Sequence, residues 1–115
     1  MQKNKFPTYN DGVVSIYREK GKYTSFAAKQ NVSTLEDMEF IVKLAFSEMS
    51  KREQDQTFAE QNGFTLSLKV KTRFFKNLDN KCKAVIDGFL YDISHVDKTK
   101  TECFLYLQGV KEIDS

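Results

Sequence analysis

A regular alternation of apolar and polar residues runs through positions 64–75. One face of this segment carries four apolar side chains and a threonine: Leu66, Leu68, Val70, Thr72 and Phe74. The opposite face carries Ser67, Lys69, Lys71 and Arg73. Because successive side chains of a β-strand point to opposite faces, this two-residue period predicts a strand whose apolar face is buried.

Four further segments combine short apolar runs with flanking turn residues, as strands do: residues 13–17, 82–86, 90–96 and 102–110. In the first of them, Val14 and Ile16 share a face. Asp87 and Gly88 separate the second from the third, and this pair is typical of two-residue hairpin turns. Residues 97–101 predict another turn. Three consecutive antiparallel strands with short turns, together with the early strands, predict a small antiparallel β-barrel or sandwich.

Residues 35–49 fit two periodicities. A helical stripe is formed by Leu35, Met38, Ile41, Val42, Ala45, Phe46 and Met49. A strand pattern is formed by Val42, Leu44 and Phe46 alternating with Lys43, Ala45 and Ser47. Periodicity alone favours the helix. Residues 51–62 predict a second, clearer helix, because they are strong helix formers and Gly63 follows them as a stop.

Composition bounds the size and setting of the protein. The 115 residues fit one domain, residues 1–115, in which we expect 1–10 to be a flexible lead and 111–115 a flexible tail. The net charge of +2 argues against whole-protein attraction to nucleic acid or membrane. The polar first residues do not resemble a signal peptide, and no apolar run approaches the ~18 residues of a membrane span. We therefore expect a protein that is made and used in the cytoplasm, or on something assembled there, without membrane contact.

Charge is distributed in blocks along the chain. Residues 1–34 and 63–83 are basic, whereas residues 35–62 and 84–115 are acidic. Such alternation suits a protein that meets copies of itself, positive patch to negative patch. Unrelated solvated faces would produce the same pattern.

Residues for catalysis or cofactor binding are sparse. Cys82 and Cys103 lack C-x-x-C spacing, so we interpret them as free thiols. His95 is the only histidine and has no evident partner base or ligand. The five glycines are scattered, so they form no phosphate-binding loop. We predict no enzyme, cofactor or metal, with a small hydrolase or redox protein using His95 and a cysteine as a distant alternative.

The basic face of residues 64–75 has two interpretations. Lys69, Lys71 and Arg73 could follow a phosphate backbone, which makes a small nucleic-acid-binding barrel the main alternative function. An aromatic platform for bases is less evident, because Phe74 falls on the core face and only Phe75 points outward. A solvated or subunit-facing strand surface explains the same residues, and we favour it.

Four stretches resemble the head–tail joining proteins of tailed bacteriophages, in the versions found in phages or prophages of Gram-positive bacteria. They are DGVVSIYREK at 11–20, LAFSEMSKRE at 44–53, LSLKVKTR at 66–73 and AVIDGFLYDI at 84–93. The resemblance runs in order from about residue 12 to residue 110. It rests on the order and spacing of these elements rather than on any one of them.

The resemblance implies a specific fold and role. Such proteins, also called head-closure, connector or stopper proteins, are small β-barrels with a short helix. They form a homo-oligomeric ring in the virion neck, under the portal and its adaptor proteins. The ring is assembled in the cytoplasm of the bacterial host. It retains packaged DNA without sequence specificity and provides the docking surface for the tail and its completion protein.

The resemblance also bears on two segments of this chain. It implies that residues 40–48 form a strand and only residues 51–62 a helix, against the helical stripe. A loop between the early strands, within residues 18–37, is implied to project into the channel. The residues of this candidate channel loop are Lys20, Lys22, Lys29, Gln30 and Asn31. In that setting Lys69, Lys71 and Arg73 would face a neighbouring subunit or the DNA.

Overall fold

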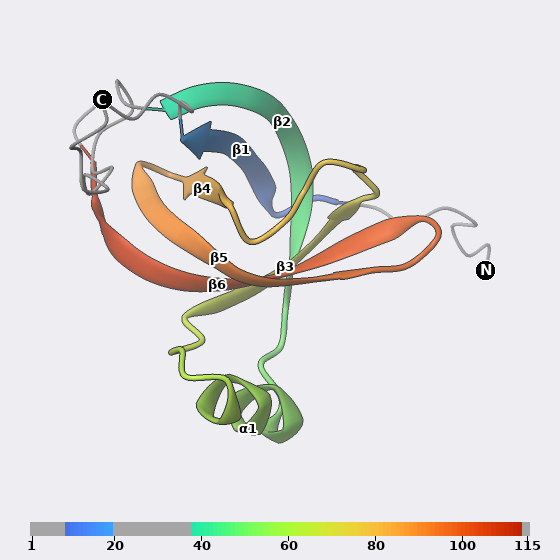
Figure 1. Ribbon diagram of the computed structural model, residues 1–115. Helices are drawn as coiled ribbons and strands as arrows, with labels where there is room; N and C mark the ends of the chain where they lie inside the picture. Colours follow the sequence, from blue (N-terminus) through green and yellow to red (C-terminus); the bar gives the residue numbers. More distant parts are fainter. Residues whose placement is uncertain (1–8, 20–37, 114–115) are drawn as a thin grey trace.

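The computed structural model describes residues 9–19 and 38–113 (Figure 1). These residues form six strands and one helix: β1 (Gly12–Glu19), β2 (Met38–Met49), α1 (Glu53–Gln61), β3 (Leu68–Arg73), β4 (Cys82–Ile86), β5 (Phe89–Lys98) and β6 (Glu102–Glu112). All pairings are antiparallel, and the strands close into a barrel in the order β1-β2-β3-β6-β5-β4. The predicted small antiparallel barrel with one short helix is confirmed.

Alternating side chains of the strands fill the barrel. Val14 and Ile16 of β1 and Val70 and Thr72 of β3 are fully buried, as their spacing predicts. Leu68 is only half-buried and packs at the edge of this core. The alternation thus places the inward face of β3 correctly over residues 68–72.

The alternation fails at the end of β3. Phe74, predicted to be core, is 40% exposed, whereas Phe75, predicted to point outward, packs against the core. The reason is that β3 ends at Arg73. The chain then turns, with the backbone N–H of Phe74 donating to the carbonyl of Thr101 at 2.9 Å, so the two-residue period no longer applies.

Residues 38–49 form strand β2, so the helix favoured by periodicity is wrong. β2 pairs with β1 over residues 38–46 and with β3 over residues 46–49. Pairing on both sides outweighs the local helical pattern, since it satisfies the backbone and buries Phe46. Phe46 also lies against Gly12, where a Cβ would approach its ring to 3.0 Å.

The β4–β5 hairpin turns through Asp87 and Gly88, as predicted. Both residues have positive φ, at 50° and 76°, which is the conformation of a type I′ turn. Beside this turn, β6 continues to Glu112, and Ile113 donates its N–H to the carbonyl of Gly88. Residues 111–113 are therefore paired backbone rather than the start of the expected tail.

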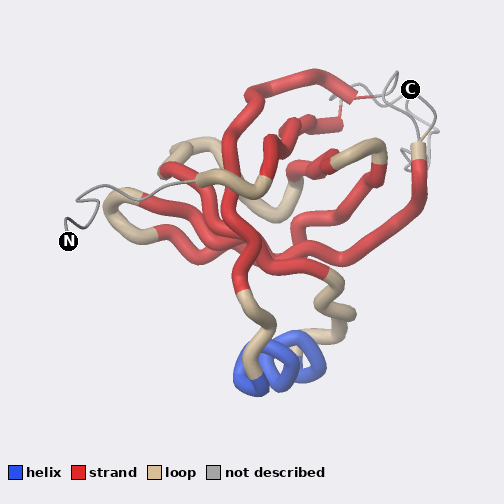
Figure 2. Tube along the Cα trace, turned by 180° about the vertical axis from the view of Figure 1, so that it is seen from behind, coloured by secondary structure: helices blue, strands red, loops and turns tan. Residues whose placement is uncertain are grey.

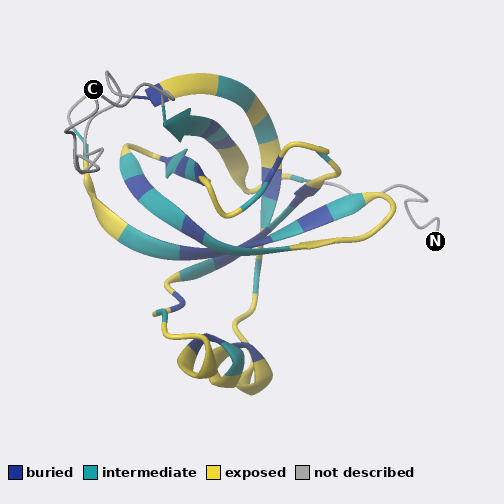
Figure 3. Cartoon of the chain, viewed as in Figure 1, coloured by how far each residue is buried: buried dark blue, intermediate teal, exposed yellow. Residues whose placement is uncertain are grey.

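Helix α1 lies outside the barrel, on the outer face of β3 and β6 (Figures 1 and 2). It docks through a second, smaller apolar cluster made of Ala59, Leu66 and Tyr106 with Phe58, Phe64 and Phe104 around them. Leu66 thus packs under the helix and not inside the barrel. Figure 3 shows the buried side of the helix facing the strands and its exposed side facing solvent.

Candidate functional site

Lys69 does not belong to a solvated basic face. It lies opposite Tyr106 in the β3–β6 register and is covered by α1, leaving it 5% exposed. Its ammonium contacts both carboxylate oxygens of Asp55, at 3.1 and 3.2 Å. The nitrogen also lies 5.1 Å from the centre of the Tyr106 ring. The cation predicted to face a partner is therefore neutralised within the fold.

Asp55 links the helix start to the barrel. Its carboxylate accepts the backbone N–H of Arg52 at 2.9 Å, closing the capping box of α1. Burial acts to raise the pKa of Asp55, but the Arg52 N–H and the Lys69 ammonium outweigh it and hold that pKa below its usual value. The residue is consequently a charged acceptor.

Tyr106 extends this network to the only histidine. Its hydroxyl lies 3.4 Å from Asp55 and 3.3 Å from Asp97, and Asp97 in turn contacts Nε2 of His95 at 3.0 Å. Burial and the negative charges of Asp97 and Asp55 raise the pKa of Tyr106 to about 12. The His95 ring packs between Tyr106 and Phe58 of α1. His95 therefore sits at the junction of helix and barrel.

Lys71 and Arg73 have different surroundings. Lys71 is half-buried and pairs with Glu102 at 3.6 Å, and Glu102 also accepts the hydroxyl of Tyr9 at 2.8 Å. Burial and this hydrogen bond raise the pKa of Tyr9 to about 12. Arg73 is exposed and forms no ion pair with a described residue. The three predicted cations are not brought together as one binding face.

The two cysteines are buried free thiols, as predicted, on β4 and β6. Burial raises the pKa of Cys82, which keeps the thiol protonated. Within the described part of the chain, His95 hydrogen-bonds to Asp97 and neither cysteine contacts it. The thiolate–imidazole arrangement of a cysteine nucleophile is not formed by these residues. The described His, Cys, Asp and Glu side chains also form no cluster that could hold a metal ion.

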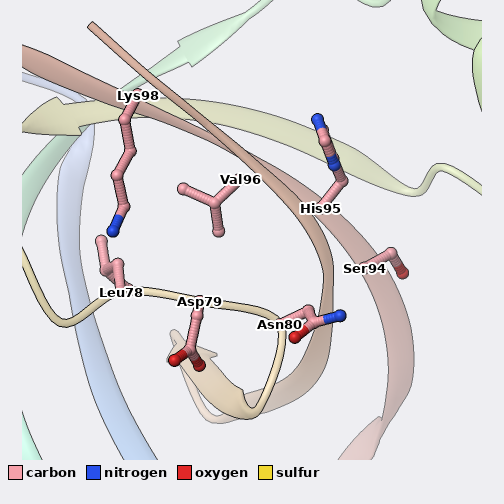
Figure 4. Close-up of a pocket in the computed structure, with 7 residues that line it drawn as sticks. All are labelled: Leu78, Asp79, Asn80, Ser94, His95, Val96 and Lys98. Atoms are coloured by element: carbon pink, nitrogen blue, oxygen red, sulfur yellow. The ribbon is translucent and has the colours of Figure 1, made fainter.

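An open cavity of about 270 Å³ lies between β5 and the β3–β4 connection. It is lined by Leu78, Asp79, Asn80, Ser94, His95, Val96 and Lys98. Figure 4 shows the polar side chains pointing in different directions rather than toward a common centre. Asp79 is moreover held by Arg18 at 3.5 Å. A substrate site needs convergent polar groups, so the cavity does not resemble one.

Lys20, Lys22, Lys29, Gln30 and Asn31 of the candidate channel loop lie outside the described residues. Arg18 and Glu19, by contrast, belong to β1, so any such loop begins after Glu19.

Sequence reasoning missed Asp55, which pairs the helix with Lys69 of β3, and Tyr106 of β6, whose hydroxyl contacts Asp55. The acid at the third helical position is a local signal for the capping box. Its pairing with a lysine fourteen residues later depends on tertiary packing.

No protein-family model matches the sequence, and no curated protein matches it. None of the described helical residues forms a span long and apolar enough to cross a membrane.

Proposed function

We propose that the chain is a structural subunit of the neck of a tailed bacteriophage, a head–tail connector of the head-closure type. In this role copies of the chain assemble into a ring under the portal. The ring retains packaged DNA and offers a docking surface to the tail. The function is assembly and sealing rather than catalysis.

The observation that carries this proposal is the structure of residues 38–61. Resemblance to the connector proteins implies a strand over residues 40–48 and a helix only over 51–62, whereas periodicity favours a helix over 35–49. The chain forms β2 over Met38–Met49 and α1 over Glu53–Gln61. The resemblance therefore anticipates a feature that the local pattern opposes, which supports applying its functional implication as well.

Charge pairing favours the connector over the alternative of a nucleic-acid-binding strand. That alternative relies on Lys69, Lys71 and Arg73 acting together. Lys69 is buried against Asp55 and Lys71 is paired with Glu102. Of these three cations, only Arg73 is exposed and without an ion-pair partner among the described residues. A phosphate backbone would gain little from such a strand, because each contact needs an available cation.

The proposed partners follow from the position in the neck. One face of the ring would meet the portal or its adaptor, and the other the tail-completion protein. DNA would pass through the channel without base-specific contacts. The protein would be located in the virion after assembly in the host cytoplasm, and the loop after Glu19 would face the channel.

The test is to delete the gene in the phage or prophage that encodes the chain and to examine the particles by electron microscopy. We expect heads that package DNA, lose it on purification and carry no tails. Supplying the wild-type chain in trans should restore tailed, filled particles. Complete infectious particles made without the protein would contradict the proposal.

A matched variant separates structure from catalysis in the same experiment. It combines His95→Gln, Cys82→Ala and Cys103→Ala, which remove the imidazole and both thiols. We expect this variant to restore tailed particles as well as the wild-type chain does, provided that its circular dichroism and melting curve show a folded barrel. A folded variant that fails to restore them would point to chemistry at these residues.

A further inference from the structure

Four exposed cations gather where the β5–β6 turn meets the end of β3. We call this surface the cationic tip; its residues are Arg73, Lys76, Lys98 and Lys100. Two contacts and one pairing bring them together. The N–H of Phe74 donates to Thr101 at 2.9 Å, and Nζ of Lys98 donates to the carbonyl of Lys76 at 2.7 Å. Arg73 lies opposite Glu102 in the β3–β6 register.

The carboxylates near the cationic tip are already engaged. Asp97 is hydrogen-bonded to His95 at 3.0 Å, and Glu102 pairs with Lys71 and accepts the Tyr9 hydroxyl. No described carboxylate forms an ion pair with any of the four tip cations. The tip therefore has a net positive charge that the described part of the chain does not neutralise, although the whole chain has a net charge of only +2.

An exposed aromatic ring lies within the cationic tip. Phe74 is 40% exposed and directly follows Arg73. An aromatic side chain among cations is the combination with which proteins bind single-stranded nucleic acid, since the ring stacks on a base while the cations contact phosphates. The alternation of residues 64–75 predicts this ring in the core, whereas the end of β3 at Arg73 leaves it exposed beside the cations.

Figures 1 and 2 both show the β5–β6 turn projecting beyond the barrel on a side away from α1. A projecting tip can reach a phosphate backbone without a groove in the protein. Long, flexible lysine side chains can contact phosphates in many orientations. Because phosphate contacts do not read the bases, such binding would not depend on DNA sequence. An acidic protein surface would accept the same charges. Binding to an acidic protein would not, however, explain why an exposed aromatic ring lies between the cations.

We propose that the cationic tip binds the phosphate backbone of DNA without sequence preference. The proposal deepens the proposed function by naming a DNA-contacting surface that is separate from the loop after Glu19. It rests on that function only for the source of the DNA. Binding by the purified chain is measurable without heads, portals or tails.

The test measures binding of the purified chain to a labelled mixed-sequence duplex and to the corresponding single strand by fluorescence anisotropy. The tip variant combines Arg73→Gln with Lys100→Gln. The control variant combines Lys43→Gln with Lys111→Gln, which removes the same charge from exposed positions elsewhere. Melting curves establish that both variants are folded.

We expect the wild-type and control proteins to bind, with affinity falling steeply between about 50 and 200 mM salt. The tip variant should bind about tenfold more weakly at the lower salt, and its slope of log affinity against log salt should be smaller by about two. Phe74→Leu should weaken single-strand binding and leave duplex binding unchanged, because the ring stacks on unpaired bases. Single-strand binding equal to that of the wild type would overturn this role of the ring.

Two outcomes would overturn the proposal. One is that the wild-type chain binds neither DNA at low salt, which would leave an acidic protein partner as the explanation of the tip. The other is an equal loss in the tip and control variants, which would mean that overall charge alone drives binding. Neither result would decide the connector function, because the gene-deletion experiment tests that function separately.

Discussion

The ammonium of Lys69 and the carboxylate of Asp55 form an ion pair that is almost removed from water, with side chains 6% and 7% exposed. Burying two charges costs about as much as their attraction returns, so the pair adds little net stability. The pair instead fixes where the helix sits on the barrel. A helix that shifted on the barrel would separate two buried charges, so the pair holds α1 in one position on β3.

Removing one partner of this pair should be costly. We expect Lys69→Ala to lower the free energy of unfolding by about 3–5 kcal/mol, because the charge of Asp55 would stay buried without its cation. Urea denaturation measures this directly. Lys71→Ala is the control and should cost less than about 1 kcal/mol, since its pair is more exposed. Equal losses in the two variants would contradict the buried-pair account.

The same network predicts a pH dependence. Asp55 titrates at 3.8 in the unfolded chain and lower in the folded one, so its stabilisation is complete above that value and is lost as pH falls through the folded pKa. Tyr106 shifts from 10 to about 12, so its contribution is complete below pH 10 and is lost as pH rises toward 12.

Melting temperatures measured over a range of pH test both the acidic and the alkaline loss of stability. The Asp55→Asn variant should lose less stability than the wild type on acidification, and Tyr106→Phe should lose less on approaching pH 12. A wild-type curve that is parallel to both variants would show that other groups control the pH limits.

At the scale of elements, the β4–β5 hairpin depends on its turn residues. Gly88 has φ of 76°, in the left-handed region where a Cβ is strained, and Asp87 has φ of 50°. Glycine and aspartate tolerate these angles better than most residues, which explains why this dipeptide closes a two-residue turn.

A substitution in this turn should therefore act through the backbone. We expect Gly88→Ala to destabilise the protein by about 1–2 kcal/mol, because alanine is strained at positive φ. Asp87→Asn should change stability by less than about 0.5 kcal/mol, since asparagine also adopts this region. Thermal denaturation compares the two. An unaffected Gly88→Ala protein would indicate that the turn changes type without cost.

At the scale of the whole molecule, each strand pairs with a neighbour on both sides. A closed barrel offers few free strand edges to a partner. Assembly of copies into a ring would then rely on side chains and loops, which leaves the barrel itself unchanged by assembly. This arrangement fits the proposed role, in which the subunit is stable before and after it joins a particle.

The segment after Glu19, which is proposed to face the channel, provides the prediction at this scale. Deleting residues 29–34 should leave the barrel folded and able to assemble, because the paired strands and core of the described residues do not include them. Heads filled in the presence of this variant should leak DNA before tails attach, as measured by DNA retention in purified particles. Normal retention by a properly assembled shortened protein would contradict the proposal that this segment faces the channel and helps to retain DNA.

Local patterns in the sequence determined most of the strand positions. The alternation in residues 68–72 and at Val14 and Ile16 identified inward faces correctly. The backbone preferences of single residues also predicted the turn at Asp87 and Gly88 and the end of the helix at Gly63. Each of these depends on the geometry of a few consecutive residues, so one sequence suffices to detect them.

Tertiary structure decided the rest. Residues 38–49 became a strand because β1 and β3 lie on either side of them. Lys69 became buried because α1 covers the outer face of β3, where alternation alone expects solvent. The tip cations come together because the β5–β6 turn meets the end of β3. In all three cases the decisive neighbour is distant in sequence, and a local period carries no information about which segment will cover a given face.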